Sequence, residues 1–203
     1  MSKITVDTVE PATGTSLTLG ASGDTITVPA GATLTNSGTF TNSGTASGFG
    51  LFSAYAILRE EQSSGTNGTT VSGTGSWITQ VINVEVDPSS IVSVSSNQFT
   101  LGAGSYLITW WSQLYAVNTG QSRLYDVTGS AVCTNGYGSS ETDGTASRSR
   151  ISTGHVRVTP SGSNVYRIEC NASSNSGPTA YWGGAAGRGG TEVYREIIIY
   201  KES

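Results

Sequence analysis

The chain has 203 residues, of which only 12% are charged, and its formal net charge is −4. Contact with a nucleic-acid backbone requires clustered Lys and Arg, and the basic residues here form no run, so the composition argues against a nucleic-acid partner. Met1 is followed by polar residues, and no apolar stretch reaches the length of a membrane-spanning helix. We therefore expect a protein made in the cytoplasm, without membrane insertion, in which Cys133 and Cys170 are reduced and buried.

The composition changes abruptly near Gly50. Residues 1–50 are almost entirely Thr, Ser, Gly, Asn and Ala, whereas all four Trp and all nine Tyr follow that point. A segment with so few large apolar side chains cannot offset its own ordering entropy, so it orders only against other chains. The sequence predicts an attachment arm over 1–50 and one folded head over 51–203, which is long enough to bury a single core.

The arm contains short alternating apolar pairs and then a repeat. Leu17 with Leu19, and Ile26 with Val28, alternate as in short strands, and Gly-rich turns separate them. From Thr33 a six-residue period (TLTNSG, TFTNSG, TASGFG) places Leu34 and Phe40 in the same position. Hexads of this kind form β-helical stacks, but one chain has too few, and three chains would complete a triangular prism in which Leu34 and Phe40 pack. The alternative is a flexible Thr/Ser/Gly linker.

The head consists of short apolar runs separated by Gly, Asn and Ser clusters, with almost no helical periodicity. This pattern predicts an all-β sandwich, most naturally a jelly roll. The expected strands are 54–58, 77–86, 98–101, 105–117, 122–127, 151–159, 164–172 and 192–201.

Two of these strands are apolar on both faces. In 105–117 the second face carries Leu107, Trp111, Tyr115 and Val117, and the Ile run of 192–201 is apolar throughout. One face of a sandwich strand meets the opposite sheet, so the other face needs a further cover. A second copy of the chain is the simplest cover, and we expect these strands to line a trimer axis. The candidates for the core and the trimer interface are Tyr106, Ile108, Trp110, Leu114, Ile197, Ile198 and Tyr200.

Aromatic and Arg side chains in Gly-rich loops are the candidates for ligand binding. They are Tyr181, Trp182 and Arg188 in one loop, and Tyr137 and Arg148 in another. Aromatic rings stack on sugars, while Arg and amide groups donate hydrogen bonds. The alternative is that Tyr181 and Trp182 belong to a short core strand.

Catalytic residues are not expected. His155 is the single histidine, so neither a Ser-His-Asp nor a Cys-His arrangement can be assembled with any specificity. The acidic pairs, Glu60 with Glu61 and Glu141 with Asp143, fall at expected strand ends or in loops. We expect no enzyme activity, no cofactor and no metal.

Several phrases of the chain resemble known proteins. The arm phrase GTSLTLGASGDTITVPAGATLTNSGT is similar to those that open tail-fibre and related virion proteins of bacteriophages, marine ones especially. The head phrases YAILREEQSSGTNGTT, WITQVINVEVD, QFTLGAGSYLI, SRLYDVTG and EVYREIIIYK resemble the C1q/TNF-like jelly-roll module. The resemblance implies a homotrimer of ten-strand heads on an intertwined stem, displayed on the virion surface after synthesis in a bacterial cytoplasm. Calcium-binding members use clustered acidic residues near the apex, and here only Glu141 and Asp143 form an acidic pair in a loop.

Two functions fit this resemblance. In the first, the protein is a short tail fibre whose head binds a glycan or protein on the host cell surface. In the second, it is a capsid decoration protein whose residues 1–50 clamp other virion proteins by adding strands to them.

Overall fold

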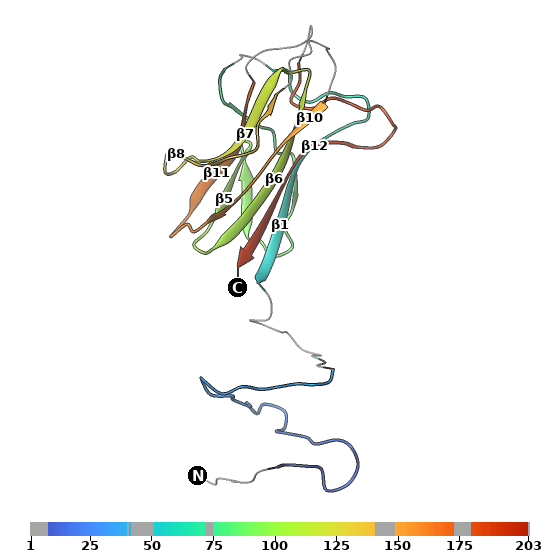
Figure 1. Ribbon diagram of the computed structural model, residues 1–203, viewed down its shortest axis with the longest axis vertical. Helices are drawn as coiled ribbons and strands as arrows, with labels where there is room; N and C mark the ends of the chain where they lie inside the picture. The colour runs from blue at the N-terminus through green and yellow to red at the C-terminus, as the bar shows by residue number, and fades with distance from the viewer. Residues whose placement is uncertain are drawn as a thin grey trace. The chain divides into compact units, whose positions relative to one another are not determined.

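The computed structural model describes residues 8–39, 41, 51–71, 75–140, 149–172 and 180–202. The chain divides into two compact units, Met1–Thr45 and Ala46–Ser203 (Figure 1). The described residues form twelve β-strands, all in the second unit, and no helix. Within these ranges there is consequently no helix that could cross a membrane.

The head is a sandwich of two antiparallel sheets. Sheet A has the order β10 (Ser149–Val158), β6 (Tyr106–Tyr115), β12 (Glu192–Glu202), β1 (Phe52–Gln62), β3 (Val84–Val86). Sheet B has the order β4 (Val92–Ser95), β5 (Gln98–Leu101), β11 (Asn164–Ala172), β7 (Thr119–Asp126), β8 (Ala131–Asn135), with the short β2 (Ile78–Thr79) on β11 and β9 (Ser139–Ser140) on β7.

The connections make this sandwich a jelly roll. The chain crosses from one sheet to the other between β5 and β6, between β6 and β7, and again on each side of both β10 and β11. A five-stranded and a seven-stranded layer joined by such crossings form a jelly-roll arrangement, so the predicted fold class is confirmed.

The core lies between the two sheets, and strict alternation along the strands builds it. In β6 every second side chain from Tyr106 is buried, as a strand with one face on the opposite sheet requires. Phe99, Leu124 and Ile168 of sheet B meet Ile108 and Ile197 of sheet A in the main cluster. A smaller second cluster surrounds Trp182.

The segment 77–86 differs from the single strand expected there. It splits into β2, which pairs with β11 of sheet B, and β3, which pairs with β1 of sheet A. Between them the Gln80 N–H still donates to Ile168 O of β11 over 2.9 Å, while the Gln80 side chain and the Val81 carbonyl accept hydrogen bonds from the buried Arg195. The sequence also gave no strand at β4, β8 or β9, where small and polar residues alternate.

The described residues of the arm form turns but no strand. The turns occur where Gly-rich phrases predicted them: Asp24 N–H donates to Ala21 O over 3.0 Å and Ala32 N–H donates to Pro29 O over 3.0 Å. The strands expected around 17–19 and 26–28 are not formed, because a strand needs a partner and this chain offers none among the described residues. Leu34 is 75% exposed, and Phe40 lies outside the described residues, so their packing in a stalk stays a prediction.

Candidate functional site

The outer side of sheet A carries several large apolar side chains, here called the apolar face, with Thr109 and Glu196 standing among them. Strand register places Tyr55 of β1 beside Tyr200 of β12, and Tyr200 beside Leu107 of β6. In the next row Ile57 pairs with Ile198. The six residues that define the apolar face are Tyr55, Ile57, Leu107, Trp111, Ile198 and Tyr200.

Aromatic stacking and ion pairs frame this face. Phe52 stacks on Tyr200 with 4.8 Å between ring centroids. Arg59 and Glu196 form an ion pair of 2.6 Å one row beyond Ile57 and Ile198. The charges here neutralise each other, so the apolar side chains between them dominate the chemistry of the face.

The predicted interface residues divide between this face and the core. Ile198 and Tyr200 lie on the apolar face, whereas the other five predicted residues point inward and are buried: Tyr106, Ile108, Trp110, Leu114 and Ile197. Val117, expected beside Tyr115 on the outer face, is buried as well. The positive φ of Ala116 (56°) breaks the strand alternation there and turns Val117 inward.

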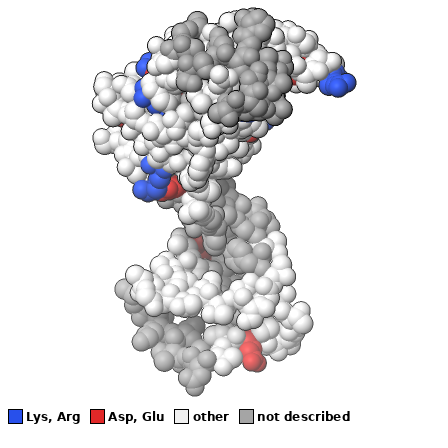
Figure 2. Space-filling view, turned by 45° about the horizontal axis from the view of Figure 1, so that its top comes forward, with Lys and Arg blue, Asp and Glu red and all other residues white. Residues whose placement is uncertain are grey.

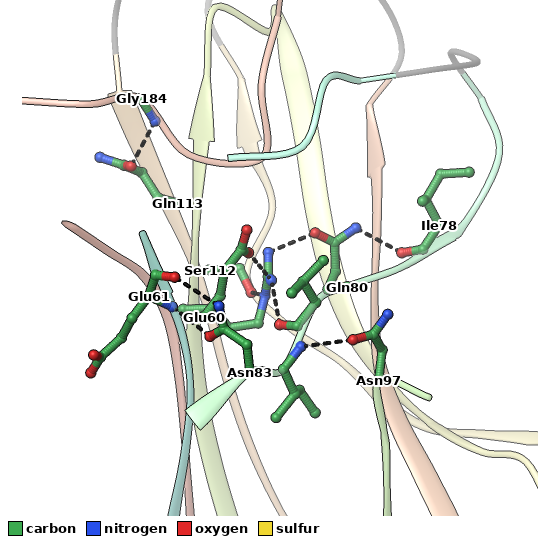
Figure 3. A network of polar contacts seen from close by, with 12 residues as sticks. Glu60, Glu61, Ile78, Gln80, Asn83, Asn97, Ser112, Gln113 and Gly184 are labelled. Atoms are coloured by element: carbon green, nitrogen blue, oxygen red, sulfur yellow. Dashed lines mark hydrogen bonds and ion pairs between the residues drawn. The ribbon is translucent and has the colours of Figure 1, made fainter. Parts of the chain in front are cut away.

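A buried charged network stands on the inner side of the same sheet. Arg195 of β12 is 0% exposed, and its guanidinium donates to Glu60 Oε2 over 2.6 Å and to Gln80 Oε1 over 2.6 Å (Figure 3). It also donates to Ser112 Oγ and to Val81 O. Every strand or segment around Arg195 contributes an acceptor, as a buried cation requires. This network ties β1, β6 and β12 to the segment after β2.

The two acidic residues Glu60 and Glu61 do not form a catalytic pair. Glu60 points inward to Arg195, and Glu61 lies on the outer side, 3.5 Å from Arg59. Burial raises the pKa of Glu60, and the attraction of Arg195 opposes that shift. Among the described residues no group of three or more His, Cys, Asp and Glu side chains could hold a metal ion. Glu141 and Asp143 lie outside the described residues.

The proposed ligand residue Trp182 belongs to the core. It is 1% exposed and packs in the second cluster with Val71, Leu114 and Cys170, so its ring is not available to a ligand. This corrects the ligand-binding assignment and selects the core-strand alternative. Tyr181 is half-buried, and its backbone bridges to Thr70 and Tyr115.

The glycines of this loop serve packing and an internal clamp. A Cβ on Gly183 would lie 2.2 Å from the Tyr194 ring, so only glycine lets Tyr194 pack there. Glu192 accepts hydrogen bonds from the backbone N–H groups of Gly187, Ala186 and Gly65, and these bonds lower its pKa. These backbone amides of the Gly-rich loop are thus bound to the chain's own carboxylate. Arg188 is exposed.

Tyr137, like Arg188, is a predicted ligand residue that the structure leaves accessible, and it is 68% exposed. Its backbone is fixed, because its N–H donates to Thr153 O over 2.6 Å and its carbonyl accepts from Ser152 Oγ over 2.6 Å. Arg148 lies outside the described residues, so its role stays a prediction.

The outer side of sheet B has a different character and is here called the polar face. Arg123 stands over the Trp77 ring at 4.0 Å, and Arg167 stands over the Tyr125 ring at 5.0 Å. Both guanidinium groups pair with Glu169, each over 2.6 Å. This cluster was not predicted, although Arg123 alternates with Tyr125 and Arg167 with Glu169 in the sequence. Figure 2 shows the charged side chains on one side of the molecule as few and separate.

Cys133 and Cys170 are free thiols, as predicted. Cys170 is a buried residue of β11, whereas Cys133 on β8 is only half-buried. Burial raises the pKa of both thiols.

No protein-family model matches the sequence, and a search of curated proteins found no match. Solved structures with a similar fold include murine APRIL (6% identity, 72% of this chain and 98% of that chain covered, TM-score 0.46) and the globular domain of zebrafish complement 1qA protein (16%, 74% and 96%, 0.42). Eiger TNF from S. frugiperda is a third (9%, 75% and 94%, 0.47). At these identities and TM-scores the likeness says nothing of ligand, partner or assembly.

Proposed function

We propose that the protein is a structural protein of a bacteriophage particle, a surface-exposed homotrimer whose head binds the host cell surface as part of a short tail fibre. The observation that carries the trimer is the apolar face of sheet A. The phage assignment is supported by the arm phrases that resemble those of virion proteins.

The apolar face supports self-association on physical grounds. Water-soluble monomers rarely keep large contiguous apolar patches exposed, and such a patch marks an interaction site. In this two-layer sandwich no described strand covers the outer side of β6 and β12. A closed ring of identical chains buries this surface in every copy. The hexad repeats of the arm favour three copies, since three chains would supply the three walls of a β-prism.

The arm supports attachment to other virion proteins. Its alternating pairs Leu17 and Leu19, and Ile26 and Val28, are all exposed in the isolated chain. Extended segments of this pattern add to the edge of a partner's sheet, with backbone hydrogen bonds for affinity and alternate side chains for specificity. Three such arms per trimer would act together through avidity.

These exposed arm residues also favour a second candidate function, capsid decoration. A decoration protein needs a strong clamp on shell proteins more than it needs a ligand site, and the arm suits that role. Both candidates share the trimer, the arm and display on the particle surface.

Immunogold electron microscopy on purified virions tests the proposal, with an antibody raised against the head. A few labels clustered at the tail are the result expected for receptor binding. Labels spread regularly over the capsid would overturn receptor binding by a tail fibre and support the second candidate function, capsid decoration. Unlabelled virions would overturn the virion assignment as a whole.

A further inference from the structure

A cavity of about 500 Å³ opens on the polar face, at the end of the sandwich where β6 ends and β7 begins. Its walls include Trp77, Gln121 of β7 and Asn171 of β11, with Ser139 and Ser140 of β9 opposite. Strand pairing places Phe52, Glu202 and Tyr106 together at the other end of the sandwich. The cavity therefore lies at the end of the head opposite the start of β1. Its volume falls in the range of small-molecule sites.

The aromatic wall of the cavity is in contact with a fixed arginine. The guanidinium of Arg123 lies 4.0 Å from the centroid of the Trp77 ring. Arg123 is in turn fixed by Glu169, over 2.6 Å, and Glu169 is 2% exposed. An indole fixed in this way loses little conformational entropy when a ligand packs on it. Because Glu169 neutralises Arg123, the arginine adds rigidity to the site rather than net charge.

The polar wall is fixed as well and contains an unused hydrogen-bonding group. Gln121 Nε2 donates to Gly136 O over 2.8 Å, and Gly136 N–H donates to Ser122 O over 2.8 Å, so the segment leading into β9 is anchored to β7. The Ser139 Oγ is buried and has no hydrogen-bond partner among the described residues. A buried hydroxyl without a partner is costly and rare, and in a cavity wall it indicates a position for a ligand's polar group.

We propose that this cavity binds a neutral saccharide unit, with Trp77 as the stacking wall and Ser139, Gln121 and Asn171 as hydrogen-bonding groups. The described lining residues are all uncharged: one indole, amides, hydroxyls and glycines. A sugar ring offers C–H faces to the indole and hydroxyl groups to amide and hydroxyl partners. An anionic ligand would require a cation, and none lines the described cavity. This inference deepens the proposed receptor-binding function and rests on it for its biological meaning.

Saturation-transfer NMR on the full chain tests the proposal. The probes are the methyl glycosides of glucose, galactose, mannose and N-acetylglucosamine, with sialic acid as the anionic comparison. We expect at least one neutral glycoside to bind, with a dissociation constant on the order of 1 mM for a single site. Failure of all neutral glycosides, or binding of sialic acid alone, would overturn the proposal.

Two variants locate the binding. Ser139→Ala should weaken the bound glycoside about tenfold, the effect of one lost hydrogen bond. It should leave the melting temperature unchanged or higher, because the Oγ makes no hydrogen bond in the free protein. Trp77→Ala should abolish the signal, and Ser93→Ala, at an exposed serine of β4 that does not line the cavity, should change nothing. Binding that survives both Ser139→Ala and Trp77→Ala would place the site elsewhere and overturn the proposal. The proposed trimer and its place on the virion are tested by separate measurements, namely oligomeric state and virion labelling. A negative result for saccharide binding would therefore leave both of those proposals untouched.

Discussion

On the outer side of sheet A, β6 and β12 present Leu107, Trp111 and Ile198, whereas on the outer side of sheet B, β7 and β11 present Arg123 and Glu169 with their stacked aromatic neighbours. The two sheets have the same antiparallel geometry and lie in the same sandwich. In both, every second side chain points away from the core, so the backbone gives no reason for the difference. The residues alone make one surface suited to contact with protein and the other suited to contact with water.

Under the proposed function, this difference lets one small fold both assemble and present a site. The apolar face gains free energy when a second copy covers it. The polar face is already satisfied by its own ion pairs and cation–π contacts, and it stays available for a ligand. Assembly and recognition then use opposite sides of the head and do not compete.

The largest expected effect comes from placing a charge on the apolar face. Trp111→Glu should dissociate the trimer, with a loss of about 2–4 kcal/mol at each of the three interfaces, because the carboxylate would be desolvated among apolar groups. The matched change on the polar face, Tyr125→Glu, places a carboxylate beside Arg123 and Arg167 and should leave the trimer intact. Native mass spectrometry of both variants makes the comparison. Equal effects, or none, would show that the two faces do not differ in this way.

The next largest effect is on the free energy of unfolding, and it compares a residue on the inner side of β12 with its neighbour on the outer side. Arg195→Met should lower the free energy of unfolding by about 3–5 kcal/mol at pH 7, because it leaves Glu60 buried without its cation. Its neighbour Glu196 faces outward, and Glu196→Gln should cost about 1 kcal/mol or less. Urea denaturation at one fixed protein concentration measures both.

The cost of Arg195→Met should depend on pH with a defined sign. Burial already raises the pKa of Glu60, and removal of Arg195 raises it further, since Arg195 is the group that opposes the shift. A carboxyl group whose pKa is raised in the folded state stabilises the fold fully below its ordinary pKa of 4.5. This stabilisation is lost as the pH rises through the pKa of the folded state. The variant should therefore come closest to the wild type near pH 4.5 and differ most at neutral pH. A cost independent of pH would contradict this account of the network.

A smaller effect is expected where β10 closes over the core. A Cβ on Gly154 would lie 2.2 Å from the Trp110 ring, so Gly154→Ala must displace the indole from its hydrogen bond with Ser122. We expect a loss of about 1–3 kcal/mol from overpacking. Thr153→Ala, one residue earlier and facing outward, should be nearly neutral in thermal unfolding of the same protein preparation. A neutral Gly154→Ala would mean that the Trp110 layer tolerates repacking.

The smallest effect is local and concerns the loop that carries Arg188. The N–H groups of Gly187, Ala186 and Gly65 lower the pKa of Glu192, so the stability that they contribute is present above pH 4.5 and is lost as the pH falls through the folded-state value. Hydrogen-exchange protection factors of these three amides should fall on acidification, and Glu192→Gln should show the reduced protection already at pH 7. Protection that is unchanged in the variant would remove Glu192 as the clamp.

The sequence predicted the parts of the fold that depend on simple alternation. The long strands β6, β11 and β12 were identified because their apolar residues recur at the strand period over nine or more residues. It missed β4 and β8, whose small and polar side chains carry little periodic signal. It merged β2 and β3, since nothing local indicates that Gln80 and Val81 bind an arginine more than a hundred positions away in the chain.

The candidate site was harder to predict, because exposure depends on tertiary packing. Tyr137 and Trp182 are both aromatic residues next to glycine, yet one is exposed and the other is core. The sequence holds no local sign that Gly183 accommodates Tyr194. The sequence places Trp77 at the start of an ordinary strand, and only the tertiary structure shows that it lies in a cavity wall and contacts Arg123.

Sedimentation equilibrium of the wild-type chain, over a wide range of concentrations, tests the central claim most directly. The account predicts a single species with three times the 20.9 kDa mass of one chain, because the apolar face is covered by copies of itself. A folded monomer at every concentration would contradict it, since the outer side of sheet A would then be stable in water without a partner.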